Sequence, residues 1–259
     1  MPLADPLAFA ALPPVTLHAL RAREPGGPGA ADCVAECLTL ACAYAELGIE
    51  TQIRVAELAV TDAKTGAQAV HGIPRPHWEE GRFYGHTVLW LPEHRHLIDP
   101  AAERYTEIAA WKAGPVIAAA GPREASDSDE ASDSDDDTIC LTVTRGYLRL
   151  GYTLGPRAAA DGVLGDQGAR AARDGARVRG VNLASEVVWL LASERPAAET
   201  AVVPYPRAAA LVDAARGLER HGAVGEDVFF VPRGALPGTE TIRLHQVPLP
   251  AGIPAPAVV

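Results

Sequence analysis

One uninterrupted run of residues, from Cys33 to Leu47, constrains the fold of this chain most strongly, because it contains neither glycine nor proline. Asp32 precedes the run at the position of a helix N-cap, and Gly48 follows it at the position of a C-cap. Apolar side chains recur on most sides of such a helix, a pattern typical of a buried helix. The sequence therefore predicts a helix over residues 33–47 that lies in the core.

Alternating apolar residues predict the strands that this helix packs against. Residues 49–60 favour one strand, and Thr87–Leu91 and His96–Asp99 favour a β-hairpin whose turn is formed by residues 92–95. Residues 61–81 are typical of an irregular loop. Further elements are expected as helices at 103–113, 181–192 and 208–220, and as strand structure with bends at 139–154. The pattern predicts an α+β fold in which a buried, cysteine-bearing helix packs on an antiparallel β-sheet.

The length of 259 residues suits one large domain. We divide the chain into a Pro/Gly-rich N-terminal segment at 1–28, a single α+β domain at 29–247 and a Pro-rich tail at 248–259. The segment 124–137 contains the sequence Glu-Ala-Ser-Asp-Ser-Asp twice and has no apolar residue larger than alanine. It is typical of a disordered acidic insert that interrupts the domain.

Charge and hydropathy exclude several classes of protein. The net charge is −10, but residues 126–137 alone carry seven acidic side chains, so the remainder is only mildly acidic. No stretch combines Lys and Arg with aromatic residues, which disfavours nucleic-acid binding. No apolar run approaches the roughly 20 residues of a membrane span, and the first 20 residues lack the features of a secretory signal. We expect a cytoplasmic protein that binds neither nucleic acid nor membrane.

The residues with chemical potential occur in a fixed order: Asp32-Cys33 at the helix start, Gly85-His86 before a strand, and Asp99-Pro100 at the end of the next strand. A thiol at a helix N-terminus lies near unpaired N–H groups and the positive end of the helix dipole, both of which favour the thiolate. The same N–H groups are candidates to bind an oxyanion during acyl transfer.

The predicted hairpin provides a geometric test of the other two residues. If the turn is centred between Glu93 and His94, Val88 is opposite Asp99, and His86 lies two residues further along the same face. Such diagonal neighbours are about 7–8 Å apart, close enough for a side-chain hydrogen bond. Asp99 then orients the imidazole of His86, which can exchange a proton with Cys33. A register slip of one residue would place His86 and Asp99 on opposite faces.

This order of residues resembles the transglutaminase-like branch of the papain-like cysteine superfamily, over roughly Gly29 to Pro100. The family pattern often has an aromatic residue soon after the histidine, whereas Thr87 and Val88 follow here. The resemblance implies that Cys33 is the nucleophile, His86 the general base and acid, and Asp99 the orienting residue. It implies a protease, amidase or acyltransferase that acts on a small-molecule or peptide amide, ester or thioester through a thioester intermediate, without cofactor or metal.

Two alternatives remain open at this stage. The first is a catalytically silent binding or scaffolding domain with the same fold, because cysteine is among the residues most often buried for packing alone. The second is a structural zinc site formed by Cys33, Cys37, His94 and His96, since zinc accepts mixed sulfur and nitrogen ligands. Cys37, Cys42 and Cys140 are otherwise expected to be core residues that are buried for packing.

Overall fold

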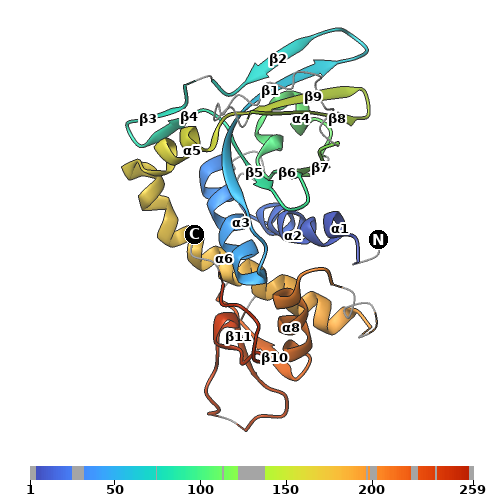
Figure 1. Ribbon diagram of the computed structural model, residues 1–259, viewed down its shortest axis with the longest axis vertical. Helices are drawn as coiled ribbons and strands as arrows, with labels where there is room; N and C mark the ends of the chain where they lie inside the picture. Colours follow the sequence, from blue (N-terminus) through green and yellow to red (C-terminus); the bar gives the residue numbers. More distant parts are fainter. Residues whose placement is uncertain are drawn as a thin grey trace, which may run out of the picture.

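The computed structural model describes residues 4–24, 32–73, 75–112, 114–121, 138–196, 198, 203–222, 227–236 and 238–256 (Figure 1). The acidic insert predicted at 124–137 lies outside the described residues. Elements are labelled as in Figure 1, with η for 3₁₀ helices. The predicted α+β class is confirmed, because a buried helix that begins with Cys33 packs on an antiparallel sheet.

Helix α3 (Cys33–Leu47) has the bounds that the sequence predicts. The Asp32 side chain accepts hydrogen bonds from the backbone N–H groups at the helix start, and Gly48 ends the helix in the left-handed conformation with φ 76°. Only Ala35 and Glu46 of its residues are not fully buried. The capping residues and the absence of helix breakers therefore determine the position of this helix, and its apolar surface places it in the core.

Among the described residues, seven strands form one antiparallel sheet in the order β7-β6-β5-β1-β9-β8, with β2 paired to β1. Strand β1 joins two parts of this sheet. Its first residues pair with β5, whereas residues 56–62 pair with β9 on one side, and residues 58–61 pair with β2 on the other. The strands are β1 (Gln52–Asp62), β2 (Gln68–His71), β5 (Thr87–Leu91), β6 (His96–Asp99), β7 (Val116–Ala119), β8 (Ile139–Arg145) and β9 (Leu148–Leu154).

Both faces of the sheet are buried around β5. Leu89 and Leu91 belong to the large hydrophobic cluster that contains α3, whereas Val88 and Trp90 belong to a second cluster with residues of β9. Successive side chains of a strand point to opposite faces, so β5 separates the two clusters. A strand buried on both sides gives a rigid support for the residues at its ends.

The N-terminal segment contains two helices that the sequence analysis did not predict, α1 (Pro6–Ala10) and α2 (Leu12–Arg21). They pack on the core: Phe9 is fully buried against Tyr205, and the Tyr44 hydroxyl of α3 donates a hydrogen bond of 2.5 Å to the Ala10 carbonyl. Proline at the first positions of both helices misled the prediction, because proline breaks a helix only in its interior.

Helix α6 (Gln167–Glu194) lies along α3 (Figure 1) and is much longer than the helix predicted at 181–192. Gly180 explains the close approach of the two helices. A Cβ at this position would lie 2.4 Å from the Cβ of Cys42 and 2.6 Å from the Thr39 carbonyl oxygen. Helix packing thus requires the glycine that directly precedes the predicted helix.

Other boundaries also differ from the prediction. The expected loop at 61–81 contains β2 and β3 (His77–Glu79), because the Asp62 side chain accepts hydrogen bonds from the N–H groups of Lys64 and Thr65 and closes a turn between β1 and β2. The helix expected at 103–113 is replaced by η2 (Ala102–Arg104) and α4 (Thr106–Ala109). The remaining elements are β4 (Arg82–Tyr84), α5 (Arg157–Leu164), α8 (Pro206–Ala215), β10 (Leu218–His221), β11 (Phe229–Pro232) and η3 (Leu244–Gln246).

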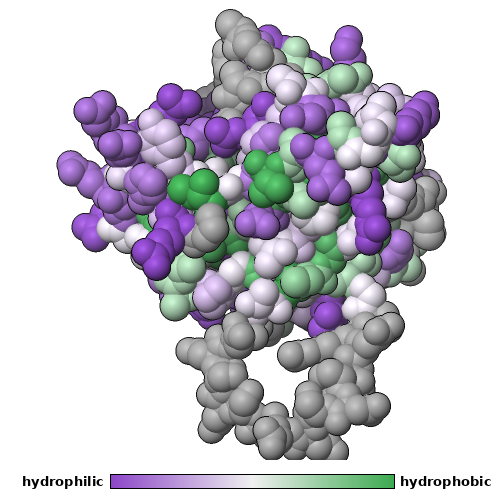
Figure 2. Space-filling model, turned by 90° about the horizontal axis from the view of Figure 1, so that it is seen from above, coloured by the Kyte–Doolittle hydropathy of each residue, from purple (hydrophilic) through white to green (hydrophobic). Residues whose placement is uncertain are grey.

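The surface is largely polar on the side that Figure 2 shows, and apolar side chains appear there in small patches between charged ones. Among the described residues, no helix combines the length and hydrophobicity that crossing a membrane demands.

Candidate active site

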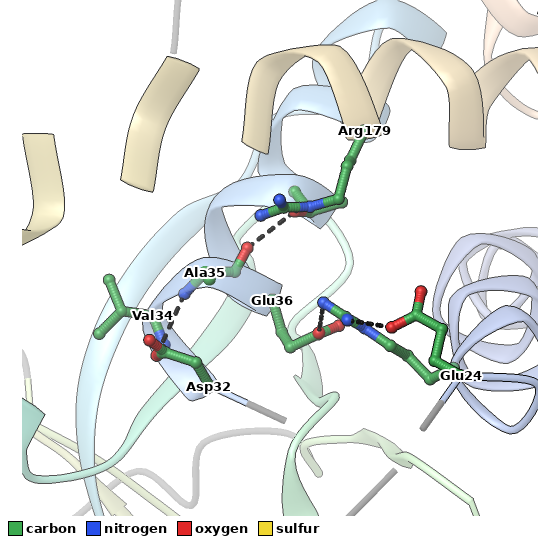
Figure 3. A network of polar contacts seen from close by, with 8 residues as sticks. Glu24, Asp32, Val34, Ala35, Glu36 and Arg179 are labelled. Atoms are coloured by element: carbon green, nitrogen blue, oxygen red, sulfur yellow. Dashed lines mark hydrogen bonds and ion pairs between the residues drawn. The ribbon is translucent and has the colours of Figure 1, made fainter. Parts of the chain in front are cut away.

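Cys33 is the first residue of α3, and the capping interactions place its sulfur at the positive end of the helix. One oxygen of the Asp32 side chain accepts hydrogen bonds from the N–H groups of Val34 at 2.9 Å and Ala35 at 3.4 Å (Figure 3). These two N–H groups, which the sequence analysis offered for oxyanion binding, are thus occupied by Asp32. The cap orients the cysteine but leaves less of the helix N-terminus free than expected.

An ion pair from α2 and a hydrogen bond from α6 hold the N-terminal part of α3. The Glu36 carboxylate is 2% exposed and lies 2.5 Å from a guanidinium nitrogen of Arg21 in α2, and Arg21 also pairs with Glu24 (Figure 3). Burial raises the pKa of Glu36, and Arg21 opposes this rise. Arg179 of α6 donates a hydrogen bond to the Thr39 hydroxyl one turn further along α3. The end of the helix that carries Cys33 is therefore held from two sides.

His86 directly precedes β5, and Gly85 is required for its position. Gly85 has φ 153°, and a Cβ there would lie 2.7 Å from both Phe83 and Pro76. The backbone carbonyl of His86 accepts a hydrogen bond of 2.9 Å from the N–H of Ala56 in β1. Gly85 thus fits where a larger residue would clash, and the hydrogen bond to Ala56 fixes the backbone of His86 at the start of β5.

The predicted hairpin register is confirmed, since Leu89 pairs with Ile98 and Leu91 with His96. In this register His86 and Asp99 lie on one face, and His86 Nε2 is 2.8 Å from Asp99 Oδ2. Two further donors hold the carboxylate: the Tyr152 hydroxyl at 3.0 Å and the Ala101 N–H at 3.1 Å. Asp99 is therefore positioned to fix the orientation of the imidazole ring.

The Cys33 thiol and the His86 imidazole form a coupled pair. Burial opposes charge on both groups, yet the pKa of Cys33 is lowered by its interaction with the positively charged His86 and by the charge of Arg104. Burial alone would lower the pKa of His86, but the Asp99 carboxylate and the Cys33 sulfur raise it to about 10. His86 Nδ1 is buried and has no hydrogen-bond partner by distance and angle among the described residues. These shifts favour a thiolate–imidazolium pair near neutral pH.

No family model, curated protein or solved structure matches this chain. The transglutaminase-like resemblance thus remains an expectation from the motif. What the structure adds to it is the contact between His86 and Asp99 and the electrostatic coupling of His86 to Cys33.

Sequence reasoning missed three side chains that surround the pair. Arg104 of η2 donates a hydrogen bond of 3.2 Å from Nη1 to the sulfur of Cys33. The ring of Tyr105 packs edge-on against His86 and stacks on His71 at a centroid distance of 3.8 Å. Tyr152 of β9 is the donor to Asp99. No sequence pattern marks these residues: Arg104 and Tyr105 follow Asp99 closely in the chain, and Tyr152 reaches Asp99 through the pairing of β9 with β1.

The structure does not assemble the zinc site considered from the sequence. Among the described residues, no group of three or more His, Cys, Asp or Glu side chains could hold a metal ion. Cys37 is one turn beyond Cys33, and burial raises its pKa well above the ordinary value. The pKa of Cys42 is also raised by burial. Cys140 is exposed on β8, so its expected place in the core is wrong. Of the three buried thiols, Cys33 is the one whose pKa is lowered.

The site is closed to solvent within the described residues. Cys33 and Asp99 are 0% exposed, and His86 is 1% exposed. A cavity of about 600 Å³ lies elsewhere, near the C-terminal end of α3, where Gly48, Gln52 and Arg157 line it. An external molecule can therefore reach the Cys33 sulfur only when the side chains that cover it move.

Proposed function

We propose that this protein is a cysteine-dependent acyl-transfer enzyme of the cytoplasm, in which Cys33, His86 and Asp99 act on a small-molecule or peptide amide, ester or thioester. The observation that carries the proposal is the 2.8 Å contact between His86 and Asp99 in the hairpin register that also couples His86 to the Cys33 sulfur. A cysteine with a lowered pKa beside an oriented imidazole is the arrangement that nucleophilic catalysis requires.

The chemistry follows from the positions of the three side chains. The thiolate of Cys33 attacks the carbonyl carbon of the substrate, a carbon–sulfur bond forms, and the carbonyl electron pair moves to oxygen. When this intermediate collapses, the bond to the leaving group breaks, and the proton held at His86 passes to that group. Water or an amine then attacks the thioester carbon while His86 accepts its proton. When this second tetrahedral intermediate collapses, the carbon–sulfur bond breaks, which regenerates the Cys33 thiolate beside a protonated His86. Water as acceptor gives hydrolysis, and an amine gives acyl transfer.

Asp99 supports these steps without touching the substrate. Its carboxylate accepts a hydrogen bond from the Nε2–H of His86. Nδ1 is then the ring nitrogen that exchanges protons with the Cys33 sulfur and the leaving group. The bonds from Tyr152 and Ala101 limit rotation of the carboxylate. Asp99 therefore acts as a positioning residue.

A second candidate is a binding or scaffolding domain that keeps this fold without catalysis. The complete burial of Cys33 and Asp99 favours it, because an inactive thiol can be retained in a core for packing alone. This candidate predicts a slow reaction of Cys33 with external reagents, whereas the enzyme must open often enough to admit a substrate.

Thiol reactivity distinguishes the two candidates. For the enzyme, iodoacetamide at about pH 6.5 should alkylate Cys33 at least about tenfold faster than Cys37, Cys42 or Cys140, because ordinary thiols are almost fully protonated there. His86→Ala should remove most of this preference, and His245→Ala, which changes an exposed histidine, should leave it unchanged. Mass spectrometry of proteolytic peptides locates the label. Equal labelling of all four thiols, or a preference that survives His86→Ala, would support the silent domain instead.

A further inference from the structure

Arg104 contacts the Cys33 sulfur directly but has no role in the reaction steps described above. Its Nη1 donates to the Cys33 sulfur at 3.2 Å, and its positive charge lowers the pKa of that thiol. The guanidinium also lies over the ring of Tyr105, 5.7 Å from the ring centroid. Arg104 belongs to η2, which begins three residues after Asp99, so the segment that ends β6 supplies both the orienting carboxylate and this cation.

Several donors near the start of α3 are already engaged. The N–H groups of Val34 and Ala35 both donate to the Asp32 side chain. The imidazole of His86 is needed for proton transfer to the leaving group, and its Nε2 is bound to Asp99. A charged donor close to the Cys33 sulfur is therefore well placed to bind an oxyanion formed on a carbon attached to that sulfur.

We propose that Arg104 binds the oxyanion of the tetrahedral intermediate formed at Cys33. This inference rests on the proposed acyl-transfer function. As the thiolate attacks, negative charge leaves the sulfur and develops on the carbonyl oxygen, which is attached to the carbon bonded to sulfur. A guanidinium within hydrogen-bond distance of the sulfur can follow that charge with a small movement, because it carries several N–H donors in one plane. In the resting protein the same group stabilises the thiolate.

Two reactions of the same sulfur separate these roles. Iodoacetamide alkylates the thiolate at a saturated carbon and forms no oxyanion. p-Nitrophenyl acetate acylates it through a tetrahedral oxyanion and releases p-nitrophenolate, whose absorbance reports the rate. Dividing each rate by the thiolate fraction, obtained from the ultraviolet absorbance of the thiolate as a function of pH, removes the effect of Arg104 on the pKa of Cys33.

The experiment compares the full chain with Arg104→Gln, Arg104→Lys and the control Arg82→Gln, which removes an exposed arginine from β4. Subtracting the signal of Cys33→Ser corrects for acylation elsewhere. In Arg104→Gln we expect acylation per thiolate to fall about 100-fold, the size typical for loss of one oxyanion donor, whereas alkylation per thiolate changes less than about threefold. Arg104→Lys should give an intermediate acylation rate, and Arg82→Gln should match the unsubstituted chain.

The outcomes are distinguishable. If acylation and alkylation fall by the same factor, or if acylation per thiolate is unchanged, Arg104 does not bind the oxyanion and the inference is wrong, although the enzyme proposal stands. If the unsubstituted chain is alkylated at Cys33 but never acetylated there, the proposed function fails and the inference with it. Circular dichroism checks folding. Should Arg104→Gln not fold, a selective loss of acylation in Arg104→Lys carries the same conclusion.

Discussion

Replacing Asp99 by asparagine tests the electrostatic basis of the site, because it removes one charge while keeping the shape of the side chain. The carboxylate lies 2.8 Å from His86 Nε2, where a unit charge interacts with an imidazolium by roughly 6 kcal/mol at an effective dielectric constant of about 20. This energy corresponds to a change of about four in the pKa of His86. We therefore expect the pKa of His86 in Asp99→Asn to fall from about 10 to its ordinary value or below.

A neutral His86 no longer stabilises the Cys33 thiolate, so the pKa of Cys33 should rise, because the effect of burial is then opposed mainly by the charge of Arg104. Nuclear magnetic resonance of the imidazole carbon-bound protons follows the titration of His86, with His86→Gln providing the assignment. Alkylation by iodoacetamide between about pH 5 and 10 follows Cys33. At about pH 6.5 the rate in Asp99→Asn should be at least about tenfold lower than in the unsubstituted chain.

Asp213→Asn is the matched control, because Asp213 is an exposed carboxylate on α8, remote in sequence and outside the contacts of the site. It should change neither titration. If Asp99→Asn leaves His86 charged at about pH 8 and Cys33 as reactive as before, Asp99 does not determine the charge state of the pair. The role assigned to Asp99 would then be wrong.

Two further predictions concern stability. In Cys33→Ala, the raised pKa of His86 stabilises the fold fully below about pH 6.5 and progressively less as the pH rises toward the folded pKa of His86, so urea titrations should show the free energy of unfolding declining over this window. In the unsubstituted chain the lowered pKa of Cys33 offsets that decline up to about pH 9. A parallel pH dependence of the two proteins would contradict the electrostatic interaction between Cys33 and His86. Gly85→Ala should lower the free energy of unfolding by about 1–3 kcal/mol, because the added Cβ meets Phe83 and Pro76 at 2.7 Å. Gly66→Ala is the control, because Gly66 also has a positive φ but a Cβ there meets nothing within 4 Å, and it should have a smaller effect in the same urea titration.

Local signals in the sequence were sufficient for the elements that carry the three predicted site residues. Asp32 and Gly48 specify the ends of α3 because their capping roles depend on neighbouring residues only. The hairpin register follows from the turn and from alternation, since a shift by one residue would move its apolar side chains to the wrong face. The contact between His86 and Asp99 could therefore be predicted across 13 residues of chain.

Contacts that depend on distant pairing could not be predicted in this way. Arg104 approaches Cys33 across 71 residues, and Tyr152 approaches Asp99 across 53. The position of Tyr152 requires β9 to pair with β1 and so to lie in the same sheet as β5 and β6. Nothing in the residues around Tyr152 specifies that pairing. The contacts of Tyr152 and Arg104 thus depend on topology, as does the approach of Cys33 to His86, whereas the contact between His86 and Asp99 follows from local sequence.

The close approach of α3 and α6 has a consequence for the divergence of this fold. Any side chain at position 180 would collide with the backbone carbonyl of Thr39, so helix packing alone restricts this position to glycine, whether or not Cys33 reacts. Under the proposed function, Arg104 and His86 are under a different constraint, which exists only while Cys33 reacts with a substrate. A descendant of this chain that kept Gly180 and lost Arg104 and His86 would have the same fold but would lack the proposed reaction at Cys33. Substitutions at position 180 would therefore indicate a change in helix packing, whereas substitutions at positions 86 and 104 would indicate loss of the proposed reaction.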